Sequence, residues 1–530
     1  MVRFQLASVL GLCLLYVCGL SQQCHADPVI ELLYVENQLL DGAENLPGFD
    51  SFRDRVRPNG QRRITAALNG NFVGAVNTDS SQGNSGFVGT YYLFGSSDFG
   101  ATPTALRREA TLSGLEQETI GSNGIDYAGN VTYSATLVNP NAPPNRFASL
   151  WENDINIFVE GDTIPAGPLA GQMFDSALGV YRSPSGVSSW ISEYVGTQSG
   201  YAIFQDTTDF NVLLKSGDMV GSEGTIVDES FAISGNIRWS DSGTHYMTEV
   251  DVENGFTGTD ELPVINGAPI TTPSGAIIRE GNLVPAADGG LPGETWDFAG
   301  LFDINDTGDF VFSAFNDNVA NDSVLAVNGA IVHRENDVVD GITLSGQVQG
   351  VAINNAGDVA FVWNDTVFIN DQKVAGLGTL VDTNDDDIGD DPIVNFSLGR
   401  LEITDQPAAG GDGFPVTYFA GRVSGDRSMY VRLKPATGDP DFDGDFDVDG
   451  TDFLTFQRGF GIGTTQGEGD ADGDGDVDAD DLALWKPAYG AFASPLPAGI
   501  AIPEPSSTCL MFCALLFSHL ATRCRDVDNS

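Results

Sequence analysis

The chain has 530 residues, with 24 basic and 74 acidic side chains and a formal net charge of -50. This charge argues against nucleic-acid binding, because neutralising phosphates requires a basic surface. Hydrophobic residues make up 41% of the chain, and 64 glycines and 25 prolines interrupt it. The composition therefore allows a sizeable core, but one built from short elements joined by many turns.

The N-terminus has the features of an export signal. Arg3 precedes the apolar run 6–20, and a small-residue cleavage position follows at Ala26. We therefore expect residues 1–26 to be a signal peptide and the protein to be exported. Lipidation of Cys24 is the alternative, but "LSQQC" lacks the small residues expected before a lipidated cysteine.

The cysteines are confined to the two ends of the chain. Residues 25–508 contain none, so the body has neither a disulfide framework nor a thiolate metal site. The six are Cys13, Cys18, Cys24, Cys509, Cys513 and Cys524.

A repeated phrase organises residues 27–436. Each copy is a polar turn with glycine in fourth place, followed by an alternating strand, as in "NDTGDFVFSAF" from Asn305 and "NNAGDVAFVW" from Asn354. Glycine and asparagine accept the positive φ that tight hairpin turns need. The turn glycines are Gly60, Gly129, Gly186, Gly243, Gly308 and Gly357.

A second strand phrase precedes several of these turns, for example "NVLLKSGDMVGS". One unit is therefore about four strands over 50–65 residues, and 366–435 would form a seventh, degenerate unit. Such a period predicts an all-β fold, a β-propeller of about seven four-stranded blades, with a sandwich array or solenoid as the alternatives. The repeats also resemble an uncharacterised group of secreted bacterial proteins with "INxxGxVAF" units, a resemblance that carries no catalytic residue.

Two acidic stretches, 29 residues apart, have the spacing of calcium loops. In both, carboxylates stand at positions 1, 3, 5, 9 and 12, and position 7 supplies a backbone carbonyl. Since Ca²⁺ takes six to eight oxygen ligands, we expect two sites and folding that depends on the metal. The first loop comprises Asp441, Asp443, Asp445, Asp447, Asp449 and Asp452, and the second Asp470, Asp472, Asp474, Asp476, Asp478 and Asp481.

Each loop is followed by apolar residues at helical spacing. Phe453, Phe456 and Phe460 follow the first loop, and Leu482, Trp485 and Tyr489 follow the second. This duplicated loop–helix pattern, over 437–492, resembles the type I dockerin module, which implies a small α-helical domain and a cohesin-like partner. Two departures stand out: position 6 is Gly475 in the second loop but Phe446 in the first, and positions 10 and 11 differ between the halves. The second site is therefore expected to be the stronger, and a purely structural calcium module is the rival interpretation.

We expect residues 493–530 to contain a linker followed by a sorting segment. The tripeptide 503–505, "PEP", precedes the apolar stretch 509–521, and then Arg523 and Arg525. The pattern resembles the PEP-CTERM sorting signal, which implies processing by an exosortase-type membrane protease and transient anchoring at the cell envelope. The apolar stretch is shorter than the roughly 20 residues that span a bilayer.

Enzymatic motifs are missing from the sequence. His245 and His333 have neither HExxH spacing nor a GxSxG partner, and we interpret both as packing or surface residues. No catalytic residue is assigned. The acidic run 382–391 is either a third cation site, through Asp382, Asn384 and Asp386, or a solvated loop.

Three functional hypotheses follow from these observations. The first is a non-enzymatic envelope protein whose propeller binds a polysaccharide or a protein, with Ca²⁺ in the dockerin-like module. The second is a polysaccharide hydrolase or lyase that uses propeller carboxylates. The third is a surface-layer component that self-associates. Cleavage of a bound polymer distinguishes the first from the second.

Overall fold

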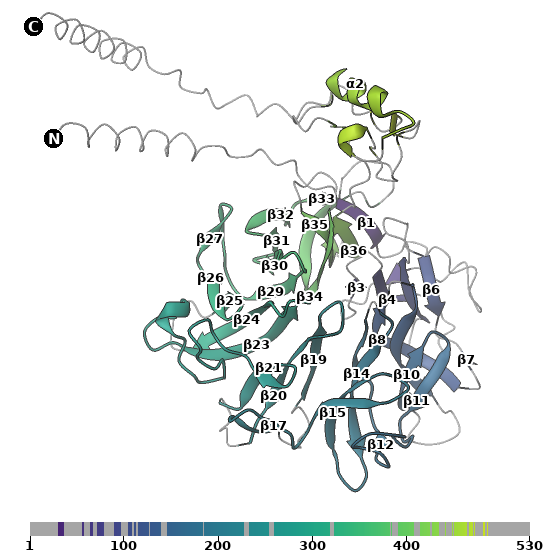
Figure 1. Cartoon of the computed structure of the whole chain (residues 1–530), viewed down its shortest axis with the longest axis vertical. Coiled ribbons are helices and arrows are strands. Elements are labelled where there is room, and N and C mark those ends of the chain that lie inside the picture. Colours follow the sequence, from purple (N-terminus) through teal and green to yellow (C-terminus); the bar gives the residue numbers. More distant parts are fainter. Residues whose placement is uncertain are drawn as a thin grey trace, which may run out of the picture. The chain divides into compact units, whose positions relative to one another are not determined.

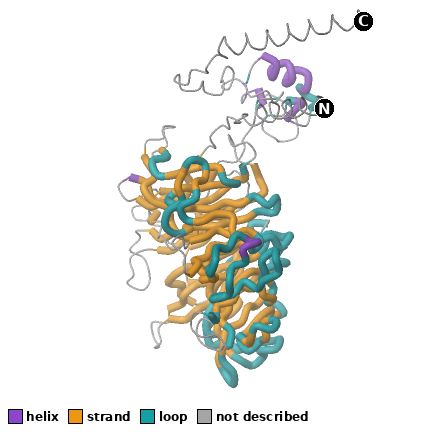
Figure 2. The backbone as a smooth tube through the Cα atoms, turned by 90° about the vertical axis from the view of Figure 1, so that its left-hand side faces the viewer, coloured by secondary structure: helices purple, strands orange, loops and turns teal. Residues whose placement is uncertain are grey.

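The computed structural model describes residues 30–35, separate strands between 56 and 112, most of 115–433, and parts of 440–485. Two compact units make up the chain, Met1–Ala436 and Thr437–Ser530. Strands dominate the described part of the first unit, whereas the second contains a helix (Figure 2).

The described strands of the first unit form seven antiparallel sheets of four or five strands, which we number as blades in chain order. Blade 1 contains β2 (Val56–Arg57), β3 (Ile64–Ala66), β4 (Phe72–Thr78), β5 (Thr90–Ser96) and β6 (Thr104–Arg108). Blade 2 contains β7 (Thr111–Leu112), β8 (Leu115–Ile125), β9 (Val131–Val138), β10 (Arg146–Glu152) and β11 (Ile155–Val159). Blade 3 contains β12 (Met173–Phe174), β13 (Leu178–Arg182), β14 (Ser188–Val195), β15 (Gly200–Gln205) and β16 (Asn211–Lys215).

The remaining blades follow the same plan, and two hairpins, β17–β18 (Met219–Val220, Gly224–Thr225) and β27–β28 (Val338–Val339, Ile342–Thr343), join neighbouring blades. Blade 4 contains β19 (Ile233–Trp239), β20 (Tyr246–Asp251), β21 (Glu261–Ile265) and β22 (Ala268–Pro269). Blade 5 contains β23 (Thr295–Ile304), β24 (Phe310–Asp317), β25 (Ser323–Val327) and β26 (Ala330–Arg334). Blade 6 contains β29 (Val348–Ile353), β30 (Val359–Trp363), β31 (Thr366–Ile369) and β32 (Gln372–Gly376). Blade 7 contains β33 (Leu380–Val381), β34 (Asp391–Pro407), β35 (Pro415–Val423), β36 (Arg427–Leu433) and β1 (Ile30–Val35).

The blades close into a ring around the strands that we call the inner strands: β3, β8, β13, β19, β23, β29 and β34. Each inner strand contacts the inner strand of the next blade, and β34 of blade 7 contacts β3 of blade 1. Figure 1 shows the sheets following one another around one axis. This cyclic order confirms the predicted β-propeller and its seven blades.

The ring is closed by a strand from the opposite end of the body. β1 pairs antiparallel with β36, with Ile30 opposite Leu433 and Leu32 opposite Val431. Blade 7 therefore takes its outermost strand from the N-terminal side of the chain.

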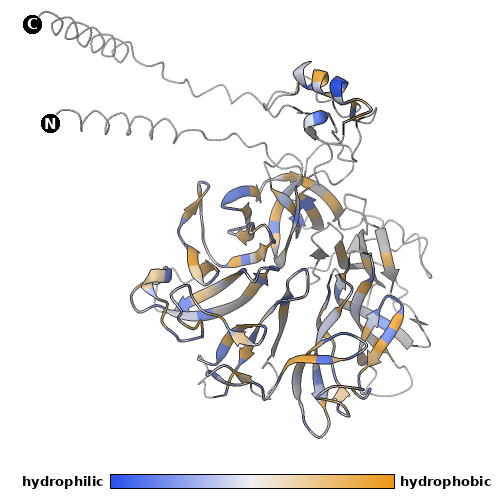
Figure 3. Cartoon of the chain, viewed as in Figure 1, coloured by the Kyte–Doolittle hydropathy of each residue, from blue (hydrophilic) through white to orange (hydrophobic). Residues whose placement is uncertain are grey.

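Buried apolar side chains between the blades form the core. Figure 3 shows hydrophobic residues along the strands of the propeller. The cluster between blades 3 and 4, for example, joins Ile191 and Leu214 to Ile237 and Val264. Similar clusters lie between the other neighbours, and the largest joins blades 6 and 7 to Leu33 of β1 and Phe72 of blade 1. Because each blade buries both sheet faces against its neighbours, the blades stabilise one another.

In blades 2 to 6 the repeated turns connect the inner strand to the second strand, whereas Gly60 precedes the inner strand of blade 1 in the sequence. Five of the six turn glycines are described, and all five have positive φ, for example +80° at Gly129 and +87° at Gly357. Each glycine N–H donates to the carbonyl of the first turn residue, as Gly308 does to Asn305 at 3.1 Å. Gly60 lies outside the described residues.

The limits of the seventh unit differ from the prediction. Residues 366–376 form β31 and β32 and belong to blade 6, because they pair with β30. Blade 7 begins only with β33, and it gains β1 in place of the two strands lost to blade 6. Sequence order alone does not reveal this exchange, since β1 lies about 400 residues before its partner.

In the second unit, helix α2 (Gly450–Gly459) follows the first acidic loop, and the 3₁₀ turn η4 (Gln466–Glu468) follows α2. Phe442, Phe456, Ala471 and Val477 form its core, with Phe453 and Trp485 packed against it. The rings of Phe453 and Trp485 lie 4.7 Å apart, so the residues after the two loops meet across this core. In the part of the chain that the structure describes, no helix is both long and apolar enough to cross a membrane.

Candidate functional site

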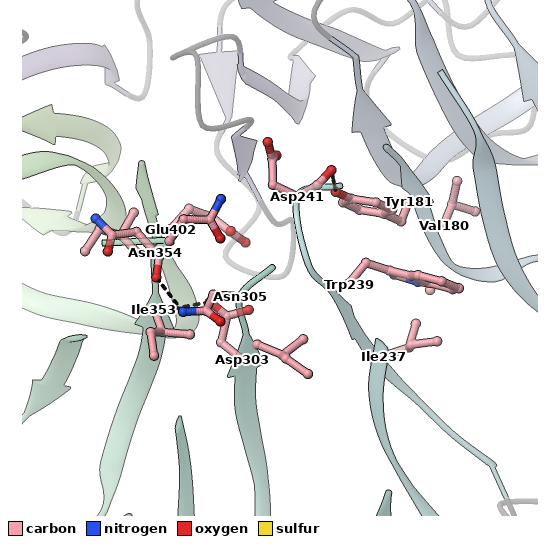
Figure 4. Close-up of a pocket in the computed structure, with 14 residues that line it drawn as sticks. Val180, Tyr181, Ile237, Trp239, Asp241, Asp303, Asn305, Ile353, Asn354 and Glu402 are labelled. Atoms are coloured by element: carbon pink, nitrogen blue, oxygen red, sulfur yellow. Dashed lines mark hydrogen bonds between the residues drawn. The ribbon is translucent and has the colours of Figure 1, made fainter. Parts of the chain in front are cut away.

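A cavity lies at the centre of the propeller, where the ends of five inner strands converge. Its empty volume is about 590 Å³, which includes space that is open to solvent. Its lining comes from β13, β19, β23, β29 and β34 and from the first residues of the turns that follow them (Figure 4). We call it the axial cavity.

The apolar part of the lining anchors the strand ends in the interblade cores. One or two such residues come from each contributing blade, and all are buried: Val180, Ile237, Ile304, Ile353 and Ile403. Because a strand alternates its side chains between two faces, the residues beside these anchors point the other way. The alternation places polar groups at the cavity in Asp303 and Glu402.

The partly exposed polar residues of the lining are mostly acidic. They are Tyr181, Asp241, Asp303, Asn355 and Glu402, and they come from all five contributing blades. Among the described residues of the lining, none is a lysine, an arginine or a histidine. Asp303 Oδ2 accepts a hydrogen bond from the Ile353 N–H at 2.9 Å, so this carboxylate also connects blades 5 and 6.

A chain of hydrogen bonds joins the turns of blades 4 to 7 beside the cavity. The third residue of the blade 4 turn and the second residue of the blade 5 and blade 6 turns each donate a backbone N–H to the side-chain oxygen of the second residue in the next turn. The three bonds run from Ser242 to Asp306 (2.7 Å), from Asp306 to Asn355 (2.8 Å) and from Asn355 to Asp405 (2.9 Å). Burial raises the pKa of Asp306, but the hydrogen bonds from Ser242 and Asn355 outweigh it and lower that pKa overall.

The asparagine side chains of the lining also form hydrogen bonds between neighbouring blades. Asn305 Nδ2 donates to the Asn354 carbonyl at 2.9 Å, and Asn354 Nδ2 donates to the Thr404 carbonyl at 2.9 Å. Asn355 Nδ2 donates to Asp306 Oδ2, also at 2.9 Å. These amides hold neighbouring blades together.

Between blades 3 and 4 the donor is a tyrosine hydroxyl and not a backbone N–H. The second turn residue of blade 3 is Pro184, which has no N–H to donate. Instead, the Tyr181 hydroxyl donates to the carbonyls of Ser240 (3.0 Å) and Asp241 (3.1 Å). The Tyr181 ring stacks on Trp239 with 6.0 Å between centroids and 8° between planes. Trp239 is buried, and its Nε1 has no hydrogen-bond partner.

Only two of the twelve predicted calcium ligands are described, Asp452 and Asp481, and both are buried. Each carboxylate closes its own loop: Asp452 Oδ1 accepts from the N–H of Phe442 at 2.7 Å, and Asp481 Oδ1 accepts from the N–H of Ala471 at 2.5 Å. In both loops the bond joins position 12 to position 2, so the duplicated sequence forms a duplicated contact. The other ten lie outside the described residues: Asp441, Asp443, Asp445, Asp447, Asp449, Asp470, Asp472, Asp474, Asp476 and Asp478.

The two histidines lie apart from the axial cavity lining. His333 Nε2 is 2.7 Å from Asp371 Oδ1 of blade 6, and the His333 ring packs beside Phe361. His245 Nδ1 is 3.1 Å from Thr244 Oγ1 in the turn of blade 4. Of the acidic run 382–391, Asp391 accepts hydrogen bonds from Thr383 and Ser424, whereas Asp382, Asn384 and Asp386 lie outside the described residues.

The residues that line the axial cavity share a position relative to the repeated turns, although the sequence analysis did not predict a cavity from it. In blades 3 to 6 the cavity residues lie two to seven positions before the repeated turn glycine, as in "DIN" at 303–305 and "INN" at 353–355. The repeated sequence therefore indicates where the inner strands end. Only closure of the ring brings the ends of five inner strands to one cavity.

Comparison with known proteins gives a distant likeness only. No family model and no curated protein matches the chain. Among solved structures, it is similar to Trypanosoma rangeli sialidase in complex with the inhibitor DANA, with 10% identity and a TM-score of 0.33 over 77% of this chain and 60% of that one. It is also similar to the GH93 α-L-arabinofuranosidase of Fusarium graminearum with arabinobiose, with 9% identity and a TM-score of 0.28 over 75% of this chain and 97% of that one. The chain thus spans about three fifths of the length of the sialidase. At these scores the likeness carries no argument about ligand or chemistry.

Proposed function

We propose that the propeller binds a saccharide in the axial cavity. The observation that carries this proposal is the convergence of five inner strands on one solvent-open cavity with a polar, hydrogen-bonding lining. Concave sites with convergent polar groups are the usual places for small ligands. Sugars, which present many hydroxyl donors, suit a lining rich in carboxylate and amide oxygens.

For the second unit we propose two Ca²⁺ sites. The bond from position 12 to position 2 that both loops form draws each loop closed, and the buried Asp452 and Asp481 each bring a carboxylate to its loop. These contacts fit the calcium-loop spacing of the sequence. Asp441 to Asp449 and Asp470 to Asp478 would supply the remaining oxygens.

The location and partners of the protein are also proposals. The signal peptide and the PEP-CTERM-like end favour an exported protein, processed by an exosortase-type enzyme and held at the cell envelope. There the ligand would be an envelope polysaccharide, and the dockerin-like unit would dock a cohesin-like protein or stabilise the chain.

Size-exclusion chromatography of the full-length protein with Ca²⁺ and a panel of labelled polysaccharides tests saccharide binding. We expect one polymer to elute earlier together with the protein. Glu402→Arg, which places a long side chain in the cavity, should abolish this shift, whereas Asp209→Arg on the exposed surface of blade 3 should preserve it. Absence of a shift with every polymer, or a shift that Glu402→Arg leaves intact, would refute the site.

Hydrolysis of the bound saccharide is a second candidate, favoured by the three carboxylates of Asp241, Asp303 and Glu402 in one cavity. Glycosidases use two such groups, one as acid and one as base or nucleophile. In the same experiment, a polymer that elutes later in shortened form would establish cleavage. Glu402→Gln and Asp303→Asn should then retain binding and reduce the rate by about 100-fold or more.

A further inference from the structure

Position 8 of each acidic loop is a valine, and the two valines differ in burial. Val477 of the second loop is fully buried, whereas Val448 of the first loop is partly exposed. Since the two residues are of the same type, the difference reflects what each of them packs against. At this position the second loop enters the core of the second unit more deeply than the first.

Val477 packs at the end of α2, the helix that follows the first loop. Its carbonyl accepts a hydrogen bond from the N–H of Gly461, just beyond the helix, at 2.8 Å. A Cβ at Gly463 would lie 2.7 Å from Val477 Cγ2, so the glycine leaves the space that the valine occupies. Phe456, on the helix itself, belongs to the same apolar cluster as Val477. The second loop thus holds the end of α2 in place.

The start of α2 belongs to the first loop. Asp452, at position 12 of that loop, lies in the first turn of the helix, and its Oδ1 accepts from the Phe442 N–H. The placement of α2 therefore determines where this carboxylate lies relative to the rest of the loop. The first loop also has Phe446 at position 6, where the second has Gly475 and where the sharp turn of a calcium loop needs glycine. Its closure therefore depends more on support from α2.

We infer that the second calcium loop controls the first: ordering of residues 470–481 packs Val477 against the end of α2, and α2 then presents Asp452 to residues 441–449. This inference rests on the two Ca²⁺ sites proposed above and specifies how they are coupled. The coupling free energy is reciprocal, but the loop that binds first does so while the other is still empty. The second loop should therefore bind Ca²⁺ without the first, whereas the first should bind only weakly without the second.

Hydrogen exchange of the full-length protein, followed by mass spectrometry over a series of Ca²⁺ concentrations, tests the inference. Peptides that contain Phe442 and Ala471 report on the two loops separately, because each of these N–H groups is bonded to the position 12 carboxylate of its own loop. We expect Asp481→Asn to raise the Ca²⁺ concentration that half-protects the first loop by at least about tenfold. Asp452→Asn should change the midpoint of the second loop by less than about threefold.

Two valine variants separate the packing of position 8 from the loss of a carboxylate. Val477→Ala keeps every acidic side chain and should raise the midpoint of the first loop by about tenfold. Val448→Ala makes the same change at position 8 of the first loop and should leave the midpoint of the second loop within about threefold of its value in the parent.

The possible results are distinct. An unchanged midpoint of the first loop in Asp481→Asn, or equal effects of either matched pair on the opposite loop, overturns the inference and leaves the calcium sites standing. If Val477→Ala stays unprotected at every Ca²⁺ concentration, the comparison of Asp481→Asn with Asp452→Asn decides alone. Absence of Ca²⁺-dependent protection from both loops of the parent refutes the calcium sites themselves.

Discussion

At the scale of single residues, the asparagines of the repeated turns act as connectors between blades. Asn354 is buried, and it uses both ends of its amide: Nδ2 donates to Thr404 O and Asp358 Oδ2, and Oδ1 accepts from the Asp358 N–H. One side chain thus shapes its own turn and fixes the position of the next blade.

Asn354→Ala should destabilise the propeller by about 2 kcal/mol, because it removes a buried amide that donates to both Thr404 and Asp358. Urea unfolding monitored by tryptophan fluorescence measures the change. Asn211→Ala, at an exposed position at the start of β16, is the matched control and should change stability by less than about 0.5 kcal/mol. Equal effects of the two substitutions would contradict the role of Asn354.

A second residue-scale feature is an acidic group on blade 4. Burial, followed by the charges of Glu261 and Asp251, raises the pKa of Glu249 to about 8, from an ordinary value of 4.5. Burial and the charge of Glu280, with smaller contributions from neighbouring acids, likewise raise the pKa of Glu261 to about 7. Because the folded state holds these protons more tightly than the unfolded state, the contribution of the two groups to stability is greatest at low pH and falls as pH rises from about 4.5 to about 8.

Glu249→Gln should flatten this fall. At pH 8.5 the variant should be more stable than the parent by about 2 kcal/mol, and near pH 4.5 the two should be equal. Free energies of unfolding measured across this pH range provide the test. A parent and a variant with parallel pH profiles would show that the Glu249 carboxyl has no raised pKa.

At the scale of elements, β1 is the strand that completes blade 7. Leu33 is buried in the cluster that joins blades 6, 7 and 1. Its partner strand β36 lies beyond every other strand of the body, so the packing of β1 couples the two ends of the ring.

Leu33→Ala should therefore cost about 3 kcal/mol, the usual cost of a cavity in a well-packed core. Thermal and urea unfolding measure it, and Leu213→Ala on the exposed face of β16 should cost less than about 1 kcal/mol. If Leu33→Ala were as mild as Leu213→Ala, β1 would not contribute to the stability of the ring.

The sequence predicted the strands and turns better than it predicted the cavity on which they converge. The turn glycines, such as Gly308 and Gly357, were found because the positive φ of a tight turn restricts the residue type. Tyr181 and Glu402 could not be paired in this way. Three blades lie between them along the chain, and they line one cavity only because the ring closes, which no local pattern encodes. The pairing of β1 with blade 7 was not predicted for the same reason.

At the scale of the whole molecule, the two units have separate cores. The cluster of the second unit contains only residues between 442 and 485. Metal binding to the acidic loops would therefore act on the second unit and leave the propeller unaffected.

Removal of calcium should therefore change the unfolding of the second unit and leave the unfolding of the propeller unchanged. With a chelator, we expect the calorimetric transition of the second unit to disappear or move down by more than about 10 °C, because loop folding requires the metal. The propeller transition should remain in place. Asp481→Asn should mimic the chelator for one loop, and a propeller transition that shifts equally would show that the two units unfold together.

The pairing of β1 with β36 has a consequence for biosynthesis. A ribosome releases the N-terminal strand first, yet its partner is made about 400 residues later. Through nearly the whole of translation, β1 has no edge to add to, and blade 7 cannot exist. The ring of the nascent chain therefore cannot close until β36 has been made, and a stop codon anywhere before the codons of β36 would leave the ring open.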